Sequence, residues 1–175
     1  IVGSQLLARV NSGLEQEFGA GKWVSFSGSA LLLNKQLISQ HRVDPDDVAD
    51  EARDLLLEEA GIAAAYTRRE LAAGSRIDGP FFGAMQRAWH VEVSGDVQYV
   101  LKPYWMFQSS TSIATHGSPY PYDTNVPILA WGPRWVKPGR VEQRVEIVDI
   151  APTVAGWLGV AVPAASEGKT LPLPK

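Results

Sequence analysis

The segment 115–128 constrains the fold most, because its glycine and prolines rule out one continuous helix or strand through it. It contains Pro119, Pro121 and Pro127, which restrict the backbone, and an apolar run follows it. Gly117 permits unusual dihedral angles directly after His116. We therefore expect a stiff loop that holds the imidazole of His116 in a fixed direction.

This loop has the residue types of half a metal site. A first-row metal binds a neutral imidazole nitrogen, and a carboxylate or carbonyl commonly anchors the second ring nitrogen. Asp123 is close enough in sequence to be that anchor for His116. The spacing leaves open the alternative that His116 is a loop histidine bonded to the backbone.

Three segments resemble the C-terminal signature of a known family: HGSP at 116–119, YDTNVP at 122–127 and VDIAPTV at 148–154. The family they resemble is the alkaline phosphatase superfamily. Within it, the segments look most like the branch of bacterial zinc phosphatases and type I phosphodiesterases or nucleotide pyrophosphatases. Shorter matches at 21–24, 61–63, 94–96 and 167–169 extend this resemblance over most of the chain.

The resemblance implies that His116 is a ligand of one of two catalytic zinc ions, while Asn125 stands where the family often has a histidine. It implies a zinc-dependent phosphomonoesterase or phosphodiesterase that acts on a phosphate ester through a Ser or Thr nucleophile. It also implies a periplasmic or secreted location. From its proximity in the loop, we expect Asp123 to orient the metal-binding imidazole of His116 through the second ring nitrogen.

The other parts of such a site are not found in this sequence. Its three histidines are His41, His90 and His116, and none follows an aspartate directly or stands four residues after one. The nucleophile segment is missing as well. We therefore expect the chain to be the C-terminal portion of a longer enzyme, inactive alone and unable to retain zinc. The start at Ile1, without Met or a signal peptide, agrees with this expectation.

The composition limits the kinds of partner and site that the chain can have. Sixteen basic and nineteen acidic residues give a net charge of -3, which argues against binding to nucleic acid as a polymer. No apolar run reaches the roughly 18 residues of a membrane span. The absence of cysteine excludes disulfides and thiolate zinc sites.

Residues 1–106 alternate helical and extended patterns. We predict helices at 4–18, 44–60 and 67–73, strands at 23–27, 30–33, 62–66 and 97–103, and a turn at 34–35, whereas 80–89 is ambiguous between helix and turn. This order indicates a small antiparallel sheet with helices on one face, as in ferredoxin-like folds. In the resembled family such a module is inserted between metal ligands. The acidic residues of 44–59 are expected to form a solvated helix face rather than a calcium site, and Arg68 and Arg69 to pair with nearby acids.

Residues 107–175 are expected to be the C-terminal segment of an α/β phosphatase core, with strands at 126–131 and 145–148. Asp149 should cap a helix that buries Val154, Trp157 and Leu158 and ends at Gly159. The fold class is therefore α/β, a partial alkaline-phosphatase-like core with a small α+β insertion. A sheet cut from its neighbours exposes apolar surface, which offers a route to dimerisation.

Two other interpretations remain. The aromatic residues Tyr104, Trp105, Tyr120 and Tyr122 could line a cleft in a non-catalytic module that binds carbohydrate or peptide. Such a module would be indifferent to chelators, whereas an enzyme part would contribute an imidazole to a metal. A complete single-metal hydrolase is the third interpretation, and the lack of a second recognisable ligand argues against it.

Overall fold

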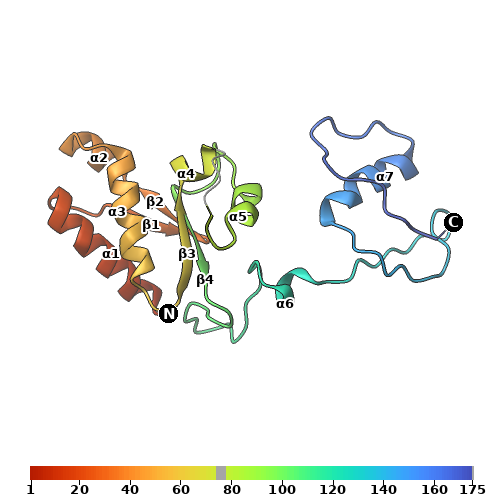
Figure 1. Cartoon of the computed structure of the whole chain (residues 1–175), viewed down its shortest axis with the longest axis horizontal. Helices are drawn as coiled ribbons and strands as arrows, with labels where there is room; N and C mark the ends of the chain where they lie inside the picture. Colours follow the sequence, from red (N-terminus) through yellow and green to blue (C-terminus); the bar gives the residue numbers. More distant parts are fainter. Residues whose placement is uncertain (74–77, 175) are drawn as a thin grey trace. The chain divides into compact units, whose positions relative to one another are not determined.

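The computed structural model describes residues 1–73 and 78–174 and divides into two compact units, Ile1–Asn125 and Val126–Lys175 (Figure 1). By packing, residues 107–125 lie with the first unit. The functional division into an inserted module at 1–106 and a phosphatase core at 107–175 stays a prediction.

A four-stranded antiparallel sheet forms the centre of the first unit, with strand order β1-β2-β4-β3. β1 (Val24–Ser27) and β2 (Ala30–Leu33) are the predicted hairpin, and β3 (Ile62–Thr67) and β4 (Val97–Leu101) complete the sheet. The prediction of a small antiparallel sheet in an α/β protein is confirmed.

Two long helices cover one face of this sheet (Figure 1). α1 (Gly3–Phe18) buries Leu6, Val10 and Leu14, which recur at the four-residue spacing of one helix face. α3 (Pro45–Leu57) begins as predicted, because the Asp44 side chain accepts a hydrogen bond from the Asp46 amide at 2.9 Å. It ends before the predicted Ala60.

Helix α2 (Lys35–His41) was not predicted. It begins where a turn was expected, since the Asn34 side chain accepts a hydrogen bond from the Leu37 amide at 3.1 Å and so caps a helix. The same side chain donates to the Lys22 carbonyl at 2.9 Å, which ties this cap to the start of the hairpin. Asparagine serves both turns and caps, so its identity alone did not decide between them.

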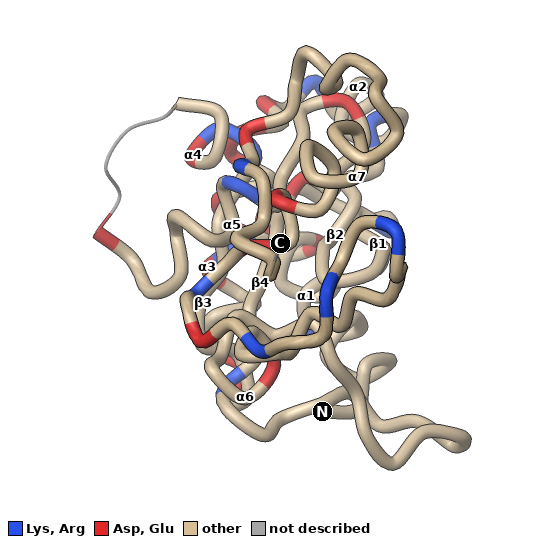
Figure 2. Tube along the Cα trace, turned by 90° about the vertical axis from the view of Figure 1, so that its right-hand side faces the viewer, with Lys and Arg blue, Asp and Glu red and all other residues tan. Residues whose placement is uncertain are grey.

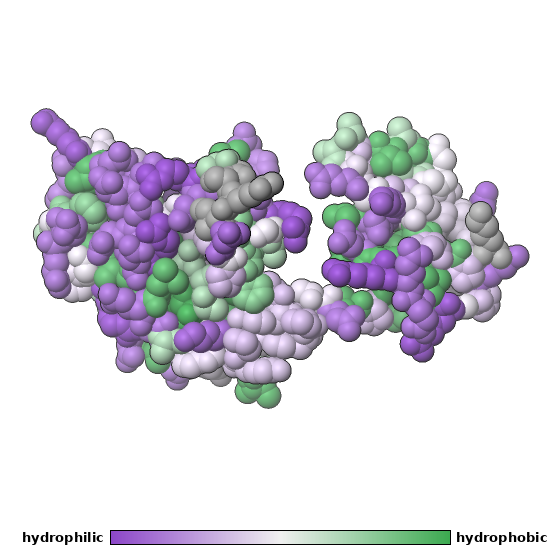
Figure 3. Space-filling view, in the orientation of Figure 1, coloured by the Kyte–Doolittle hydropathy of each residue, from purple (hydrophilic) through white to green (hydrophobic). Residues whose placement is uncertain are grey.

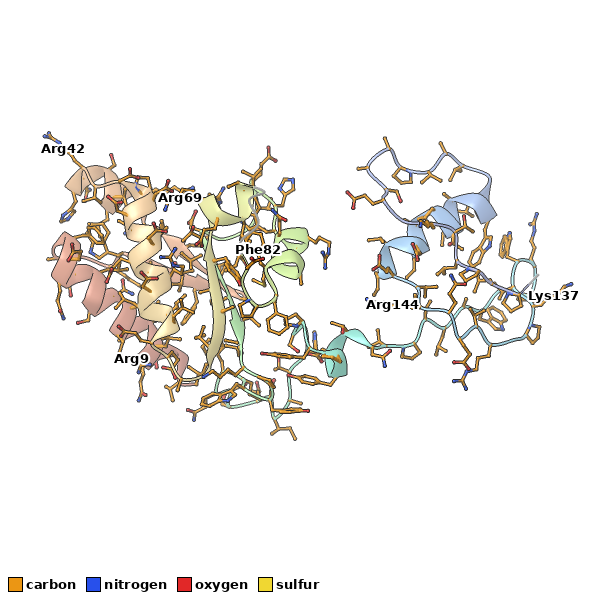
Figure 4. The ribbon with its side chains drawn as sticks, in the orientation of Figure 1. Arg9, Arg42, Arg69, Phe82, Lys137 and Arg144 are labelled. Atoms are coloured by element: carbon orange, nitrogen blue, oxygen red, sulfur yellow. The ribbon has the colours of Figure 1, made fainter. Side chains whose placement is uncertain are left out.

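The opposite face of the sheet carries a smaller cluster made by α4 (Arg68–Ala72) and α5 (Phe82–Ala88). The capping box predicted at the start of α4 is present, between Thr67 and Glu70. Phe82 points toward the sheet (Figure 4) and packs edge-on against Tyr66, with ring centroids 5.1 Å apart. Ile62 and Ala64 are two residues apart in β3 yet belong to different clusters, because a bulge lies between them.

Ion pairs join α3 to α4, and the predicted pairing of Arg69 with a nearby acid is among them. Figure 2 shows where acidic and basic residues occur along the chain. Arg53 lies 3.1 Å from Asp50, 2.8 Å from Asp54 and 3.0 Å from Glu70. Arg69 pairs with Asp50. Within the described part of the chain, no helix is long and apolar enough to cross a bilayer.

The second unit contains a 3-10 turn, η1 (Ile147–Asp149), and one helix, α7 (Ile150–Leu158). The predicted helix and its end at Gly159, with φ of 67°, are confirmed. The strands predicted at 126–131 and 145–148 are wrong for this structure, because neither segment pairs with another strand among the described residues. A β-strand needs a neighbour to satisfy its backbone groups.

The packing of α7 also differs from the prediction. Pro152, Thr153 and Ala155 are its buried residues, whereas Val154 and Leu158 are exposed. Asp149 makes no side-chain capping bond within α7. Its carboxylate instead accepts hydrogen bonds from the amides of Glu146 at 3.0 Å and Lys169 at 2.7 Å, which connects η1 to the C-terminal loop.

Candidate functional site

His116 lies in an exposed loop of the first unit, directly before Gly117. Gly117 adopts a left-handed φ of 91°, which a residue with a Cβ would adopt only with strain. A short helix, α6 (Pro121–Thr124), follows, with Pro121 in its first turn. The prediction that the glycine takes unusual dihedral angles at this point is confirmed.

Asp123 is fixed by Ser118. Its Oδ2 atom accepts hydrogen bonds from the Ser118 amide at 2.8 Å and from the Ser118 hydroxyl at 2.5 Å. These two bonds stabilise the carboxylate and lower the pKa of Asp123, and the nearby charge of His116 lowers it further. The carboxylate therefore stays ionised beside the histidine at neutral pH.

The sequence named Ser118 as part of a motif but gave it no role. Its spacing to Asp123 is the signal that could have revealed it, because a serine before a short proline-initiated helix can bond a carboxylate within that helix. Among the described residues no hydrogen bond joins His116 to Asp123. The orienting role of Asp123 thus stays a prediction.

The chemistry of this loop fits zinc, although the loop does not complete a zinc site. Zinc binds imidazole nitrogen and carboxylate oxygen, and a protein site supplies three or four such ligands. No group of three or more His, Cys, Asp or Glu side chains is placed to hold a metal in the part of the chain that the structure describes. A metal ion bound at His116 would therefore need further donors from outside this loop.

The other two histidines are engaged elsewhere. The His41 ring packs edge-on against Trp23 with centroids 5.0 Å apart, next to the main core. His90 accepts a hydrogen bond on Nδ1 from the Glu92 amide at 3.2 Å. Neither contact brings a second imidazole to His116.

Four aromatic rings form a row beside this loop. Phe81 meets Tyr120, Tyr120 stacks on Tyr122, and Tyr122 stacks on Tyr104. Trp105, which the sequence had grouped with these tyrosines, lies instead against Gly61.

Comparison with known proteins places the chain in a family. No protein-family model matches it. It is 26% identical over 165 residues to the alkaline phosphatase PafA of Elizabethkingia meningoseptica, covering 93% of this chain and 30% of that protein. It is 31% identical over 163 residues to a Myroides odoratus protein named as a calcium-transporting ATPase, covering 91% of this chain and 29% of that protein.

The crystal structure of wild-type PafA superposes on the chain with a TM-score of 0.81 and 25% identity. The match covers 95% of this chain and 32% of that structure. The chain therefore spans about a third of the length of the relatives it matches. Together with the segments around His116 and Asp149, these matches show that the chain belongs to the alkaline phosphatase superfamily.

Proposed function

We propose that the chain is the C-terminal portion of a longer zinc-dependent phosphomonoesterase or phosphodiesterase and supplies one zinc ligand, His116. The observation that carries this proposal is the loop at 116–127. This loop keeps the family signature and presents an exposed imidazole directly before Gly117, whose positive φ favours glycine. It belongs to a chain that matches PafA over 95% of its length.

The residues of this chain would act mainly by positioning. His116 would donate a ring nitrogen to zinc, and zinc supplies Lewis-acid stabilisation of a phosphoryl oxygen. Asp123, held by Ser118, would keep the imidazole oriented and favour its metal-binding tautomer. The nucleophile and the remaining ligands would come from outside the described chain, so the chain alone should neither retain zinc nor turn over substrate.

The relatives' names support a phosphatase more than a transporter. The Myroides protein carries a transport ATPase name, yet the segments around His116 in this chain resemble those of bacterial zinc phosphatases. A phosphodiesterase or nucleotide pyrophosphatase activity, a periplasmic or secreted location, and dimerisation through exposed core surface belong to this proposal.

The test compares the 175-residue chain with the full-length protein that carries it, both purified with zinc present. Zinc content and hydrolysis of p-nitrophenyl phosphate are measured on each. We expect two zinc ions and turnover only in the longer protein. Stoichiometric zinc and turnover in the short chain would contradict the proposal.

His116→Ala in the full-length protein tests the ligand itself. We expect a loss of at least about 100-fold in kcat/KM, together with a loss of zinc, because a missing ligand cannot be replaced from the same loop. The matched control is His90→Ala, which removes an exposed histidine bonded only to its own turn. Unchanged turnover in His116→Ala would refute the site assignment.

A further inference from the structure

The aromatic row beside the His116 loop has a regular geometry. Tyr120 and Tyr122 stack with centroids 5.6 Å apart and an interplanar angle of 13°. Tyr122 and Tyr104 stack at 4.8 Å and 19°. Phe81 closes the inner end, edge-on to Tyr120 at 4.9 Å. Three nearly parallel tyrosine rings therefore share one stacking direction.

Hydrogen bonds hold the inner rings in place while the outer ring is uncovered. The Tyr120 hydroxyl donates to the Leu101 carbonyl at 3.0 Å, which anchors the row to β4. The Tyr104 amide donates to the Tyr122 hydroxyl at 3.1 Å. Tyr104 is nonetheless 85% exposed. The row thus ends in an exposed ring that stacks on Tyr122.

Backbone strain marks both ends of the row. Phe81 and Tyr104 each have a φ of 64°, a left-handed conformation that is unfavourable for bulky side chains. Among the described residues, the one other non-glycine with positive φ is Arg42, which ends α2. Strain of this kind costs about 1–3 kcal/mol and persists mostly at ligand clamps and active sites. Packing of Tyr104 alone does not explain it, since the ring gains little burial.

The row is tied to the candidate metal ligand through α6. Tyr122 directly precedes Asp123, whose carboxylate bonds Ser118 and interacts with the charge of His116. A group stacked on Tyr104 would therefore extend a row of rings that continues through Tyr122 into the loop of His116. A substrate whose phosphate binds at the metal could then place the rest of the molecule against this row of rings.

We propose that Tyr104 is a stacking subsite for a planar aromatic group, a nucleobase or an aryl ring, on the alcohol side of the phosphate ester. A flat π-system continues the offset stack of the row, and base–aromatic stacking is worth about 1–3 kcal/mol per base. The reference to a phosphate ester rests on the proposed function, whereas the stacking itself does not.

The first experiment measures specificity in the full-length protein. The ratio of kcat/KM for adenosine 5′-monophosphate to kcat/KM for glycerol phosphate is compared among variants. Tyr104→Ala should lower this ratio by about 5- to 150-fold, the equivalent of one stacking contact, and Tyr104→Phe should preserve it. Val93→Ala is the control at an exposed apolar residue of the same unit. An unchanged ratio, or an equal loss with both substrates, would overturn the proposal.

The second experiment is independent of catalysis. Nuclear magnetic resonance spectra of the 175-residue chain are recorded with adenosine 5′-monophosphate and, separately, with methyl glucoside at tens of millimolar. We expect shifts centred on Tyr104 and Tyr122 with the nucleotide, which Tyr104→Ala abolishes at Tyr122. A response to the glucoside alone, or none to either, would overturn the inference. If the full-length protein hydrolyses neither ester, the proposed function fails and this second experiment still decides on the stacking subsite.

Discussion

At the scale of single residues, the contact between Ser118 and Asp123 sets the charge beside His116. The pKa of Asp123 lies below its ordinary value of 3.8, chiefly because of the Ser118 hydroxyl and amide. A lowered folded-state pKa means that the ionised carboxylate stabilises the loop above the unfolded pKa, and that this contribution disappears as the pH falls through the folded pKa. The loop is therefore expected to loosen only in acid.

Ser118→Ala should raise the pKa of Asp123 toward its ordinary value, since the hydroxyl bond is the larger cause of the shift. The measurement is a pH titration of the Asp123 carboxyl carbon by nuclear magnetic resonance. Ser112→Ala, in the preceding loop, is the control and should leave the titration unchanged. An Asp123 titration that is identical in Ser118→Ala and the unmodified chain would refute this account.

Asp96 is the buried carboxylate that holds the sheet to α4. Its side chain is 8% exposed and accepts hydrogen bonds from the Leu33 amide at 2.9 Å and from Arg68 Nε at 3.2 Å. Asp96→Ala would leave the Leu33 amide without its acceptor and remove the carboxylate that pairs with Arg68. Arg68 keeps its bonds to the Val91 and Ser94 carbonyls. We expect a loss of about 2–4 kcal/mol in the free energy of unfolding, measured by urea denaturation. Asp96→Asn keeps an acceptor and should lose less; equal losses would show that hydrogen bonding is not the cause.

At the scale of elements, a helix could be predicted where neighbouring residues determine which of its faces is buried and at which residue it begins. The stripe of α1 and the capping box of α4 depend on neighbours within a turn or two, so the sequence contains them. The segment 126–131 is different. Its apolar β-branched character favours a strand, but whether a strand forms depends on a partner strand elsewhere. The same limit applies to the site, because a metal site is assembled from distant ligands.

Helix α3 supplies a direct test of the main core. Leu56 is completely buried, whereas its neighbour Leu57 is 44% exposed. Leu56→Ala should lower the free energy of unfolding by about 2–5 kcal/mol through lost burial and a residual cavity. Leu57→Ala, which removes the same atoms from the same helix, should cost less than about 1 kcal/mol. Similar losses in the two variants, measured by urea denaturation, would contradict the burial of Leu56 and the exposure of Leu57 in this structure.

At the scale of the whole molecule, the two units differ in how much apolar surface they bury. The first unit has two clusters of buried side chains around its sheet. The second unit leaves Leu129 92% and Trp131 91% exposed, and apolar residues are visible over its surface (Figure 3). Contiguous exposed apolar surface of this kind commonly marks a contact with another segment or chain.

The exposed run at 126–131 therefore has a specific expected fate. We expect it to become a β-strand in the full-length protein, since the relatives are about three times longer and could supply the neighbouring strand. Amide hydrogen exchange reports this directly, because ladder bonds slow exchange. Residues 126–131 should exchange quickly in the 175-residue chain and slowly in the full-length protein, while α3 stays protected in both. Fast exchange at 126–131 in the longer protein would mean that the segment is a true loop, and that the missing strand partner is not the reason for its irregular backbone.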